Sequence, residues 1–318
     1  MRALVIGYHA WDVLVPCAEL PPPDAKRECP GMLAAGGGPA ATAAVALARL
    51  GVDVRYVGLL PDDGPGRLQA AELMSAGVDL SLAVPAPGAR SPLAVSLVDP
   101  ATGARRILWD RGDLRALRAD EADPAWLDDA DLLLADTHEP AAALVLARAA
   151  AARGLPSVLD AGTPRPGARE LAAACSDVIA ASGFARAVTG EAEPRRALAE
   201  LRRLGPDRTA TTCGIHGALG LDRDGFRHAP AYAVRAVDTT GAGDAFHAGY
   251  AWGLLRGEDF PGALDCGAAV AALAVGALGG RVALPAPEAV LRLRAEGDRL
   301  PVQDPAHPAF PCDRDPSG

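Results

Sequence analysis

The chain has 318 residues and a formal net charge of −9, because 40 Asp and Glu residues outnumber 31 Lys and Arg residues. A chain of this length can bury a sizeable core, as one large domain or as two modest ones. The acidic balance and the lack of a Lys- and Arg-rich stripe argue against nucleic acid or an anionic membrane as a partner.

The cysteines and the N-terminal residues indicate where in the cell the protein is expected. The six cysteines form no C-x-x-C pair and no metal-ligand spacing, and the N-terminus lacks the shape of a cleavable signal. The longest uncharged run, Cys266 to Gly280, is shorter than the roughly 20 residues that a membrane-spanning helix needs. We therefore expect a soluble, cytoplasmic protein.

Strand-like and helix-like patterns alternate along most of the chain. Short apolar runs predict strands, and longer amphipathic or alanine-rich stretches predict helices. The predicted strands are 3–7, 53–60, 131–136, 157–162, 177–182 and 208–213. The predicted helical segments are 36–51 (after a glycine-rich turn), 61–77, 140–153, 168–175 and 193–205. This alternation predicts right-handed βαβ units and a three-layer, doubly wound α/β fold with a mostly parallel sheet.

Two stretches interrupt the alternation. Residues 91–110 predict a hairpin around the turn D-P-A-T-G, and residues 13–35 contain no helical pattern. Small β segments inserted into such a sheet are suited to a lid over a site. We expect one domain over residues 1–300, with lid segments at about 13–35 and 91–112, and a poorly ordered tail at 301–318.

Residues 238–250 read DTTGAGDAFHAGY. If a helix begins near Gly243, the backbone amides of Gly241, Ala242 and Gly243 face its positive end and form an anion site. A carboxylate at Asp244 would repel a phosphate, but it suits a base that orients and deprotonates a hydroxyl attacking that phosphate. The helix dipole is expected to keep Asp244 ionised, and a glycine-rich helix start with an Asp cap is the simpler alternative. The helix is expected to pack against the sheet through Phe246, Gly249, Tyr250, Gly253 and Leu254.

The string D-T-T-G-A-G-D resembles the second signature of the ribokinase-like (PfkB) sugar kinases, in which the position of Asp244 is the catalytic base. Three segments are similar to other motifs of that family and follow its order: GGGPAATAAVALARLG (36–51), VGLLPDDGPG (57–66) and TTCGIHGAL (211–219). The resemblance covers roughly residues 1–295. It implies one α/β domain with a β lid, ATP with Mg²⁺ as cofactors, and phosphoryl transfer to a sugar hydroxyl.

On the sugar side, the resemblance assigns roles to four positions. Asp12 matches the aspartate that holds sugar hydroxyls, and Gly37 and Gly38 match the glycines beneath the sugar. Thr42 stands where an asparagine is common, which implies a changed sugar contact. The alternative for Asp12 is a strand-end aspartate bonded to the backbone.

The segments GGGPAATAAV, LLLAD and GGR look closest to the sulfofructose kinase branch of the family. The positions that bind the anionic tail in that branch align with Leu108 and His138, so the likeness does not fix the substrate. His138 is placed to meet the sugar, and Arg111 could supply a positive charge from the hairpin. A solvated histidine and an exposed arginine are the alternatives.

On the nucleotide side, Thr212, Gly214 and Gly217 match the turn that contacts ATP, with an ordinary hairpin turn as the alternative. Asp238 and the Thr240 carbonyl stand where many relatives bind a monovalent cation, which makes K⁺ a candidate. A structural turn is an equal alternative there.

The chain departs from the family at Ala181 and Phe184, where relatives often carry an Asn and a Glu that serve Mg²⁺ waters and phosphate. Asp160 could contribute instead. We therefore expect an ATP-dependent kinase that phosphorylates a primary hydroxyl of a ketose or sugar acid, with small molecules as partners and a homodimer through the lid as one arrangement. The alternatives are a nucleoside kinase of the same fold, which predicts more aromatic residues in the lid, and a non-catalytic sugar- or nucleotide-binding protein.

Overall fold

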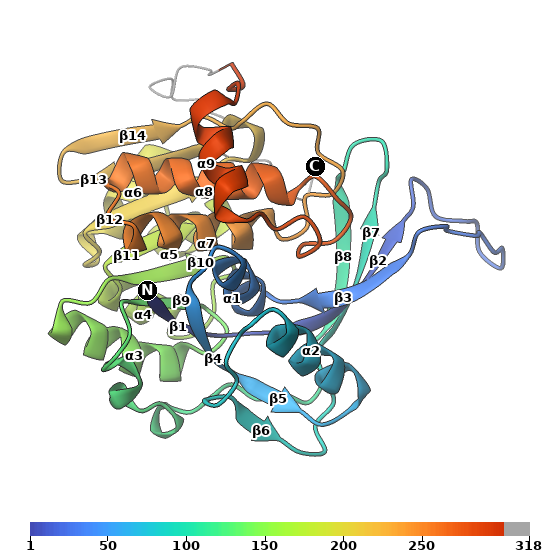
Figure 1. The fold of residues 1–318 in the computed structure, drawn as a ribbon, viewed down its shortest axis with the longest axis horizontal. Coiled ribbons are helices and arrows are strands. Elements are labelled where there is room, and N and C mark those ends of the chain that lie inside the picture. Colours follow the sequence, from blue (N-terminus) through green and yellow to red (C-terminus); the bar gives the residue numbers. More distant parts are fainter. Residues whose placement is uncertain (302–318) are drawn as a thin grey trace.

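Eight strands form the central sheet in the computed structural model of the protein, which describes residues 1–301 (Figure 1). The strand order is β14-β13-β12-β11-β10-β9-β1-β4, and all neighbours are parallel except β12–β13 and β13–β14. The predicted mostly parallel sheet is confirmed. Its strands are β1 Arg2–Ile6, β4 Asp53–Val57, β9 Leu132–Asp136, β10 Ser157–Ala161, β11 Asp177–Ala180, β12 Arg208–Thr212, β13 Ala218–Asp222 and β14 Gly225–Ala229.

Helices cover both faces of this sheet, because its strands are apolar on both sides. On β1, Ala3 and Val5 belong to the core on one face, and Leu4 and Ile6 to the core on the other. The first face carries α1 Pro39–Arg49, α7 Ala242–Leu255, α8 Phe260–Ala274 and α9 Pro287–Glu296, with α2 Gly64–Ser75 beside them. The second carries α3 Pro140–Arg153, α4 Ala168–Ala174, α5 Ser182–Thr189 and α6 Pro194–Arg203. Short 3₁₀ turns lie at Ala119–Glu121, Pro124–Leu127 and Gly214–His216.

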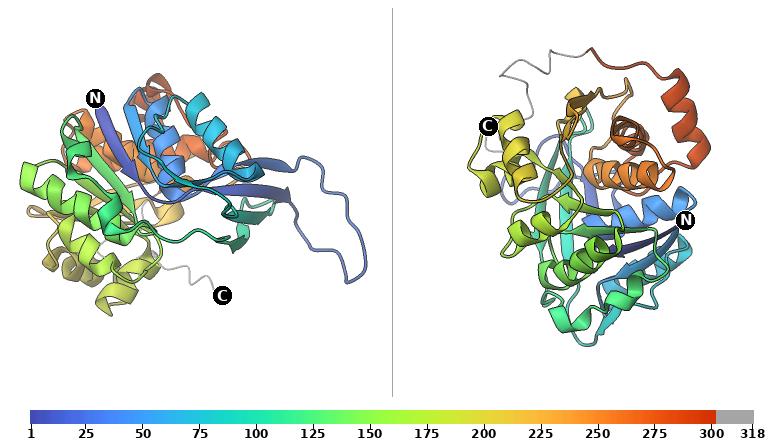
Figure 2. Two further views of the ribbon diagram at one scale, coloured as in Figure 1. Left: turned by 90° about the horizontal axis from the view of Figure 1, so that it is seen from below. Right: turned by 90° about the vertical axis from the view of Figure 1, so that its left-hand side faces the viewer.

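A second sheet of four strands, which we call the lid sheet, projects from the edge of the central body (Figures 1 and 2). Its order is β3-β2-β7-β8, and the β2–β3 connection extends away from the rest of the fold (Figure 2). The register pairs Asp12 with Ala94 and Ala94 with Trp109, so these side chains share one face. The strands are β2 Ala10–Pro16, β3 Leu33–Gly37, β7 Leu93–Val98 and β8 Arg105–Asp110.

The expected strand at 53–60 is wrong in one respect, because it breaks at Gly58. The strand β4 ends at Val57, and the chain then forms β5 (Leu59–Pro61), which pairs with β6 (Val84–Ala86) in a separate sheet. A Cβ at Gly58 would lie 2.5 Å from the Tyr56 hydroxyl oxygen, so the backbone crosses very close to the side chain of its own strand.

The expected packing of the α7 glycines against the sheet is also wrong. A Cβ at Gly249 would lie 2.7 Å from the Cys266 carbonyl oxygen, and one at Gly253 would lie 2.9 Å from the Ala263 Cα. These glycines let α7 and α8 approach closely. Within residues 1–301, no helix is long and apolar enough to cross a membrane. Nearly all of the tail predicted at 301–318 lies outside the described residues.

Candidate active site

The carboxyl ends of β1 and β9 lie side by side at the point where the strand order reverses, which is where open α/β sheets bind ligands. Asp136, the last residue of β9, is buried there and accepts hydrogen bonds from the amides of Tyr8 (2.8 Å), His138 (2.7 Å) and Ala40 (3.3 Å). Burial raises the pKa of Asp136 to about 6, against the effect of these bonds. Its carboxylate therefore joins β1, β9 and the start of α1.

Asp136 was missed as a functional position from the sequence, although LLLAD placed an acid at a strand end. The same carboxylate explains Gly7, where a Cβ would overlap the Asp136 side chain. This glycine is needed at the end of β1 because the aspartate occupies the space beside it.

Asp12 and the glycines Gly37 and Gly38 meet where β2 and β3 approach the body. A Cβ on Gly37 would overlap the Asp12 carboxylate, and Gly38 has a φ of +88°, with its Cβ position 2.5 Å from the His9 Cα. The described residues provide no hydrogen-bond donor to the Asp12 carboxylate, so the backbone-bonded alternative for Asp12 receives no support. Burial raises the pKa of Asp12 to about 6, and the nearby Asp244 raises it further.

Thr42 is placed differently from the expectation of a sugar contact. It is buried, and its hydroxyl accepts a hydrogen bond of 3.2 Å from Arg281 Nε. The same guanidinium donates to the Gly37 carbonyl oxygen at 2.7 Å and to Glu72 Oε1 at 3.1 Å. Arg281 therefore holds the turn at Gly37 in place through hydrogen bonds. The sequence analysis used the GGR segment only for resemblance and missed this role.

The N-terminus of α7 presents free backbone amides, but the predicted amide of Ala242 is not one of them, because it donates a hydrogen bond of 3.3 Å to the Thr239 carbonyl oxygen. The helix begins at Ala242 after Gly241, which has a φ of +72° and no side-chain cap. Within residues 1–301, the amides of Gly243 and Asp244 have no acceptor outside the helix, and a Cβ at Gly243 would meet nothing within 4 Å. A Cβ at Gly241 would lie 2.8 Å from the Gly280 Cα. Gly241 thus permits the tight turn before α7, and the absence of a side chain at Gly243 leaves open space in front of the helix start.

Asp244 lies at this helix start, and burial raises the pKa of its carboxyl group. His247, Arg105 and Arg281 oppose that increase. The expected ionising effect of the helix dipole is therefore opposed by burial. Arg105 comes from the lid sheet, where it donates a hydrogen bond of 2.8 Å to the Thr239 hydroxyl, and it was not predicted.

Asp160 lies close to Asp244, and the charge of Asp244 helps to raise its pKa to about 7, although burial is the larger cause. Its Oδ2 atom lies 3.3 Å from His247 Nδ1, within ion-pair distance, but has no hydrogen bond of good geometry. Ala181 only precedes α5, and Phe184 is fully buried, so neither offers a polar group.

The Asp238 carboxylate accepts hydrogen bonds from its own turn and from the 279–281 loop. Oδ1 accepts from the Thr240 amide at 2.8 Å and hydroxyl at 2.7 Å, and Oδ2 accepts from the Gly279 amide at 2.8 Å. These bonds hold the loop before α7 against the 279–281 loop. They favour the structural turn over the cation site.

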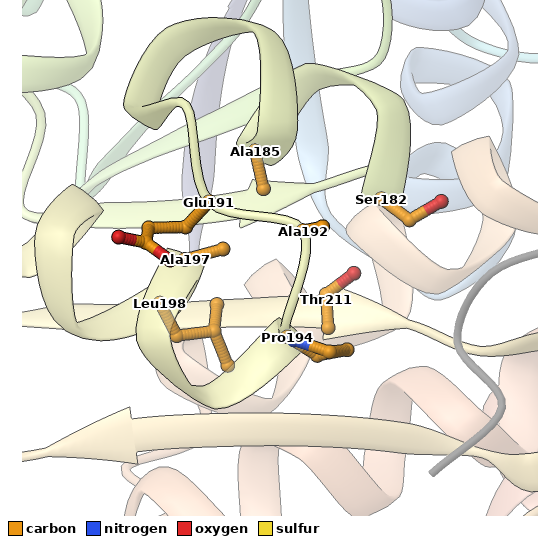
Figure 3. Close-up of a pocket in the computed structure, with 8 residues that line it drawn as sticks. All are labelled: Ser182, Ala185, Glu191, Ala192, Pro194, Ala197, Leu198 and Thr211. Carbon is orange, nitrogen blue, oxygen red and sulfur yellow. The ribbon is translucent and has the colours of Figure 1, made fainter. Parts of the chain in front are cut away.

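Thr212, Gly214 and Gly217 lie at the β12–β13 turn. Gly214 has a φ of +55° and Gly217 a φ of +85°, and a Cβ on Gly217 would overlap the Ala229 carbonyl oxygen. Beside this turn, Figure 3 shows a small hollow between α5, α6 and β12, with Ser182 and Thr211 on one side and Glu191 on the other. None of the predicted site residues lines it.

His138 and Arg111 gather around Tyr8. The His138 ring stacks on the Tyr8 ring with centroids 4.2 Å apart, and the Arg111 Cζ atom lies 5.4 Å from the Tyr8 centroid. Burial lowers the pKa of His138 to about 3, so the ring is neutral. The alternatives of a solvated His138 and an exposed, unengaged Arg111 are therefore not supported. Arg165, which was not predicted, belongs to the same cluster through its contact with His138.

Comparison with known proteins identifies the family. The model of the pfkB family carbohydrate kinases matches residues 2–287. The chain belongs to the pfkB family of carbohydrate kinases. Two relatives of this pfkB kinase are an ATP-dependent ribose-1-phosphate kinase from Halopiger xanaduensis, 33% identical over 93% of this chain and 99% of the relative, and an aminoimidazole riboside kinase from Salmonella typhimurium, 30% identical over 79% and 85%.

Solved structures agree with this assignment. A crystal structure of a ribokinase homologue from Agrobacterium tumefaciens matches with a TM-score of 0.86 at 28% identity, covering 92% of this chain and 97% of that one. The pfkB kinase is therefore an ATP-dependent sugar kinase with the ribokinase-like fold. The relatives establish the family, but they do not establish the sulfofructose kinase branch.

Proposed function

We propose that the protein transfers the γ-phosphoryl group of ATP to a primary hydroxyl of a sugar, with Asp244 as the base. The observation that carries this proposal is the position of Asp244 at an uncapped helix start with free amides, within electrostatic reach of Asp12. The relatives' names point to a ribose-based acceptor, and ketoses and sugar acids are the other candidates.

In this reaction the acceptor oxygen forms a bond to the γ-phosphorus as the bond from that phosphorus to the β-phosphate bridging oxygen breaks. The amides of Gly243 and Asp244 stabilise the charge on the transferred group. Asp12 holds neighbouring sugar hydroxyls, and the proton of the acceptor hydroxyl passes to Asp244. Because burial raises the pKa of Asp244, this carboxylate is a better proton acceptor than an exposed one.

Two cations fit this site to different degrees. The Asp160 Oδ2 atom lacks a hydrogen bond and lies near Asp244, so Asp160 fits an ATP-bound Mg²⁺, reached through a water molecule. Mg²⁺ would neutralise phosphate charge when bound. Asp238 already accepts three hydrogen bonds, so it does not fit K⁺ well. Assays with and without K⁺ test that cation.

A second candidate is a nucleoside kinase of the same fold, favoured by the aromatic cluster at the sugar side. Tyr8 stacks with His138 and meets Trp109 edge-on with centroids 6.5 Å apart, which offers a surface for a base. Turnover of adenosine or cytidine above all sugars would support it.

The test is ADP formation with a panel of ribose, ribose 1-phosphate, fructose, sulfofructose, sugar acids and nucleosides. Asp244→Asn should abolish turnover while sugar binding, measured by calorimetry, is retained. If this variant keeps most of its kcat, Asp244 is not the base. Tight sugar binding by the wild type with no ADP would instead indicate a non-catalytic protein.

We also propose that two copies pair through the outer face of the lid sheet. The register places Val13, Val95 and Leu108 together on the face opposite Asp12, and Leu108 is 67% exposed. Sedimentation of the wild type and of Leu108→Glu tests this arrangement, because a buried carboxylate would separate the copies.

A further inference from the structure

Two guanidinium groups converge on the aromatic cluster at the sugar side of the site. The Arg111 Cζ atom lies 5.4 Å from the Tyr8 ring centroid, and the Arg165 Cζ atom lies 5.9 Å from the Trp109 centroid. Tyr8 and Trp109 are themselves in edge-on contact. The two arginines come from separate parts of the chain, since Arg111 follows β8 of the lid sheet and Arg165 follows β10 of the central sheet.

Nearby carboxylates balance this convergence only in part. Within residues 1–301, no carboxylate lies within ion-pair distance of Arg165, and its Nε atom is buried without a hydrogen-bond partner. Glu139 lies 3.7 Å from Arg111 Nη2 but also accepts a hydrogen bond from the Leu117 amide. The nearby Asp136 is occupied by three backbone amides.

Burial and the proximity of two like charges oppose this arrangement, and the nearby carboxylates of Asp136 and Glu139 offset them in part. Burial lowers the pKa of Arg165, and the positive charge of Arg111 lowers it further. Two neighbouring guanidinium groups with one carboxylate at ion-pair distance are suited to holding an anion between them.

His138 completes the cluster as a neutral donor. Arg165 Nη2 lies 3.4 Å from His138 Nε2, which can accept the bond only if the ring proton resides on Nδ1. That Nδ1 atom is buried and has no partner. One histidine donor and one arginine donor are therefore unsatisfied in the same cluster.

The cluster and Asp244 lie toward opposite ends of β8, because Arg105 at the start of this strand donates to the Thr239 hydroxyl just before α7, and Arg111 follows the last residue of the strand. The pKa of Tyr8 is affected by Arg111 and Arg165, and also by Asp12. The pKa of Asp12 is in turn affected by Asp244. Since such effects require proximity, Asp12 links the two ends. A sugar held by Asp12 can direct one end to Asp244 and the other to the arginines.

We infer that the acceptor is a sugar phosphate, whose existing phosphate group binds Arg111 and Arg165 while its free primary hydroxyl faces Asp244. The inference rests on the proposed function. Guanidinium groups suit a phosphate dianion because each offers parallel N–H donors. An uncharged sugar or nucleoside would bring no negative charge to offset the repulsion between the arginines.

The experiment compares Arg165→Gln with the wild type, using ribose 1-phosphate and ribose as probes in the ADP assay. The kcat/KM for ribose 1-phosphate should fall about 10- to 100-fold, as loss of a charged hydrogen-bond donor predicts. The kcat/KM for ribose and the KM for ATP should change less than about twofold. Arg165→Lys should recover part of the loss. The control is Arg148→Gln, since Arg148 is an exposed arginine on α3.

Two outcomes would overturn the inference while the kinase assignment stands. The wild type could use ribose as well as ribose 1-phosphate, with the ratio unchanged in Arg165→Gln, or the variant could raise only the KM for ATP. If no probe yields ADP, the proposed function fails, and calorimetry decides the anion site separately. Asp244→Asn should then bind ribose 1-phosphate, and Asp244→Asn combined with Arg165→Gln should bind it at least 10-fold more weakly. Equal binding by the two variants would refute the anion site.

Discussion

Arg281 and Gly37 are 244 positions apart in the sequence, yet the Arg281 guanidinium donates a hydrogen bond of 2.7 Å to the Gly37 carbonyl oxygen. The same side chain binds Thr42 and Glu72 and is buried. The position of the Gly37 turn therefore depends on a residue contributed by the C-terminal part of the chain.

Replacing Arg281 tests this dependence. Arg281→Gln should lower the free energy of unfolding by about 2–4 kcal/mol, because Glu72 and the Gly37 carbonyl lose a charged donor in a mostly buried setting. The KM for the sugar should rise more than the KM for ATP. Urea denaturation and initial rates measure the two effects. Arg292→Gln, at an exposed position of α9, is the matched control and should change neither.

The Gly37 side of the turn offers a steric test. Gly37→Ala places a methyl group onto the Asp12 carboxylate, so Asp12 must move and the KM for the sugar should rise at least about 10-fold. Gly64→Ala is the control, because a Cβ there meets nothing within 4 Å. Equal sugar KM values for the two variants would show that Asp12 does not hold the sugar.

Replacing the two glycines at the start of α7 should affect different properties, stability for Gly241 and kcat for Gly243. Gly241→Ala should destabilise the protein by about 1–3 kcal/mol, because φ is +72° and the new methyl group meets Gly280. Gly243→Ala should leave the free energy of unfolding unchanged, since its Cβ is in open space, but should lower kcat by obstructing the transferred phosphoryl group. Thermal unfolding and kcat distinguish the two. A Gly243→Ala variant with full kcat would argue against phosphoryl binding there.

The buried carboxylates predict an acid limb in the pH profile. Burial raises the pKa of Asp12 to about 6 and raises that of Asp244. Both must be ionised to accept hydrogen bonds from sugar hydroxyls, so kcat/KM should fall as the pH falls below about 6. Rates from pH 5 to 9 test this expectation, and a profile that stays flat down to pH 5 would contradict it.

The raised pKa of Asp12 also makes the stability of the folded protein depend on pH. The pKa of Asp12 is higher in the folded protein than in the unfolded chain, so the folded state binds its proton more tightly and loses stability as the pH rises from about 4 to 6. Asp12→Asn should therefore stabilise the protein by about 1–2 kcal/mol at pH 7.5, and the gain should shrink at pH 4.5. Denaturation at the two pH values measures it. An equal gain at both would exclude ionisation as the cause.

The sequence predicts local features of this fold well. The strand expected at 131–136 is found at Leu132–Asp136, and the Asp-capped helix expected within 61–77 is α2, where Asp63 accepts from the Gly66 amide at 2.9 Å. Apolar runs and helix caps depend on residues that are close in the sequence, so local sequence patterns predict them. The helix α8 was not predicted, since Cys266 to Val270 are buried in succession and an evenly apolar helix lacks the period that marks an amphipathic one.

The residues of the candidate site also fall into two groups, those that local motifs predict and those that only long-range contacts place there. Asp244, Asp12 and Gly37 stand in short motifs, so the sequence alone singles them out as candidates. Arg281 and Arg165 were missed because their roles come from long-range approach, to Gly37 in one case and to Trp109 in the other. No local pattern records which distant residue an arginine will reach.

The close contact between Gly241 and Gly280 also bears on how such an enzyme can diversify. The proposed phosphoryl site is made of main chain resting on main chain, so it has no side chain that distinguishes one acceptor from another. The proposed anion site is made of the side chains of Arg111, His138 and Arg165, each in the connection that follows a different strand. On the proposed function, acceptor preference can therefore change by exchange of a few side chains, while the phosphoryl site stays the same.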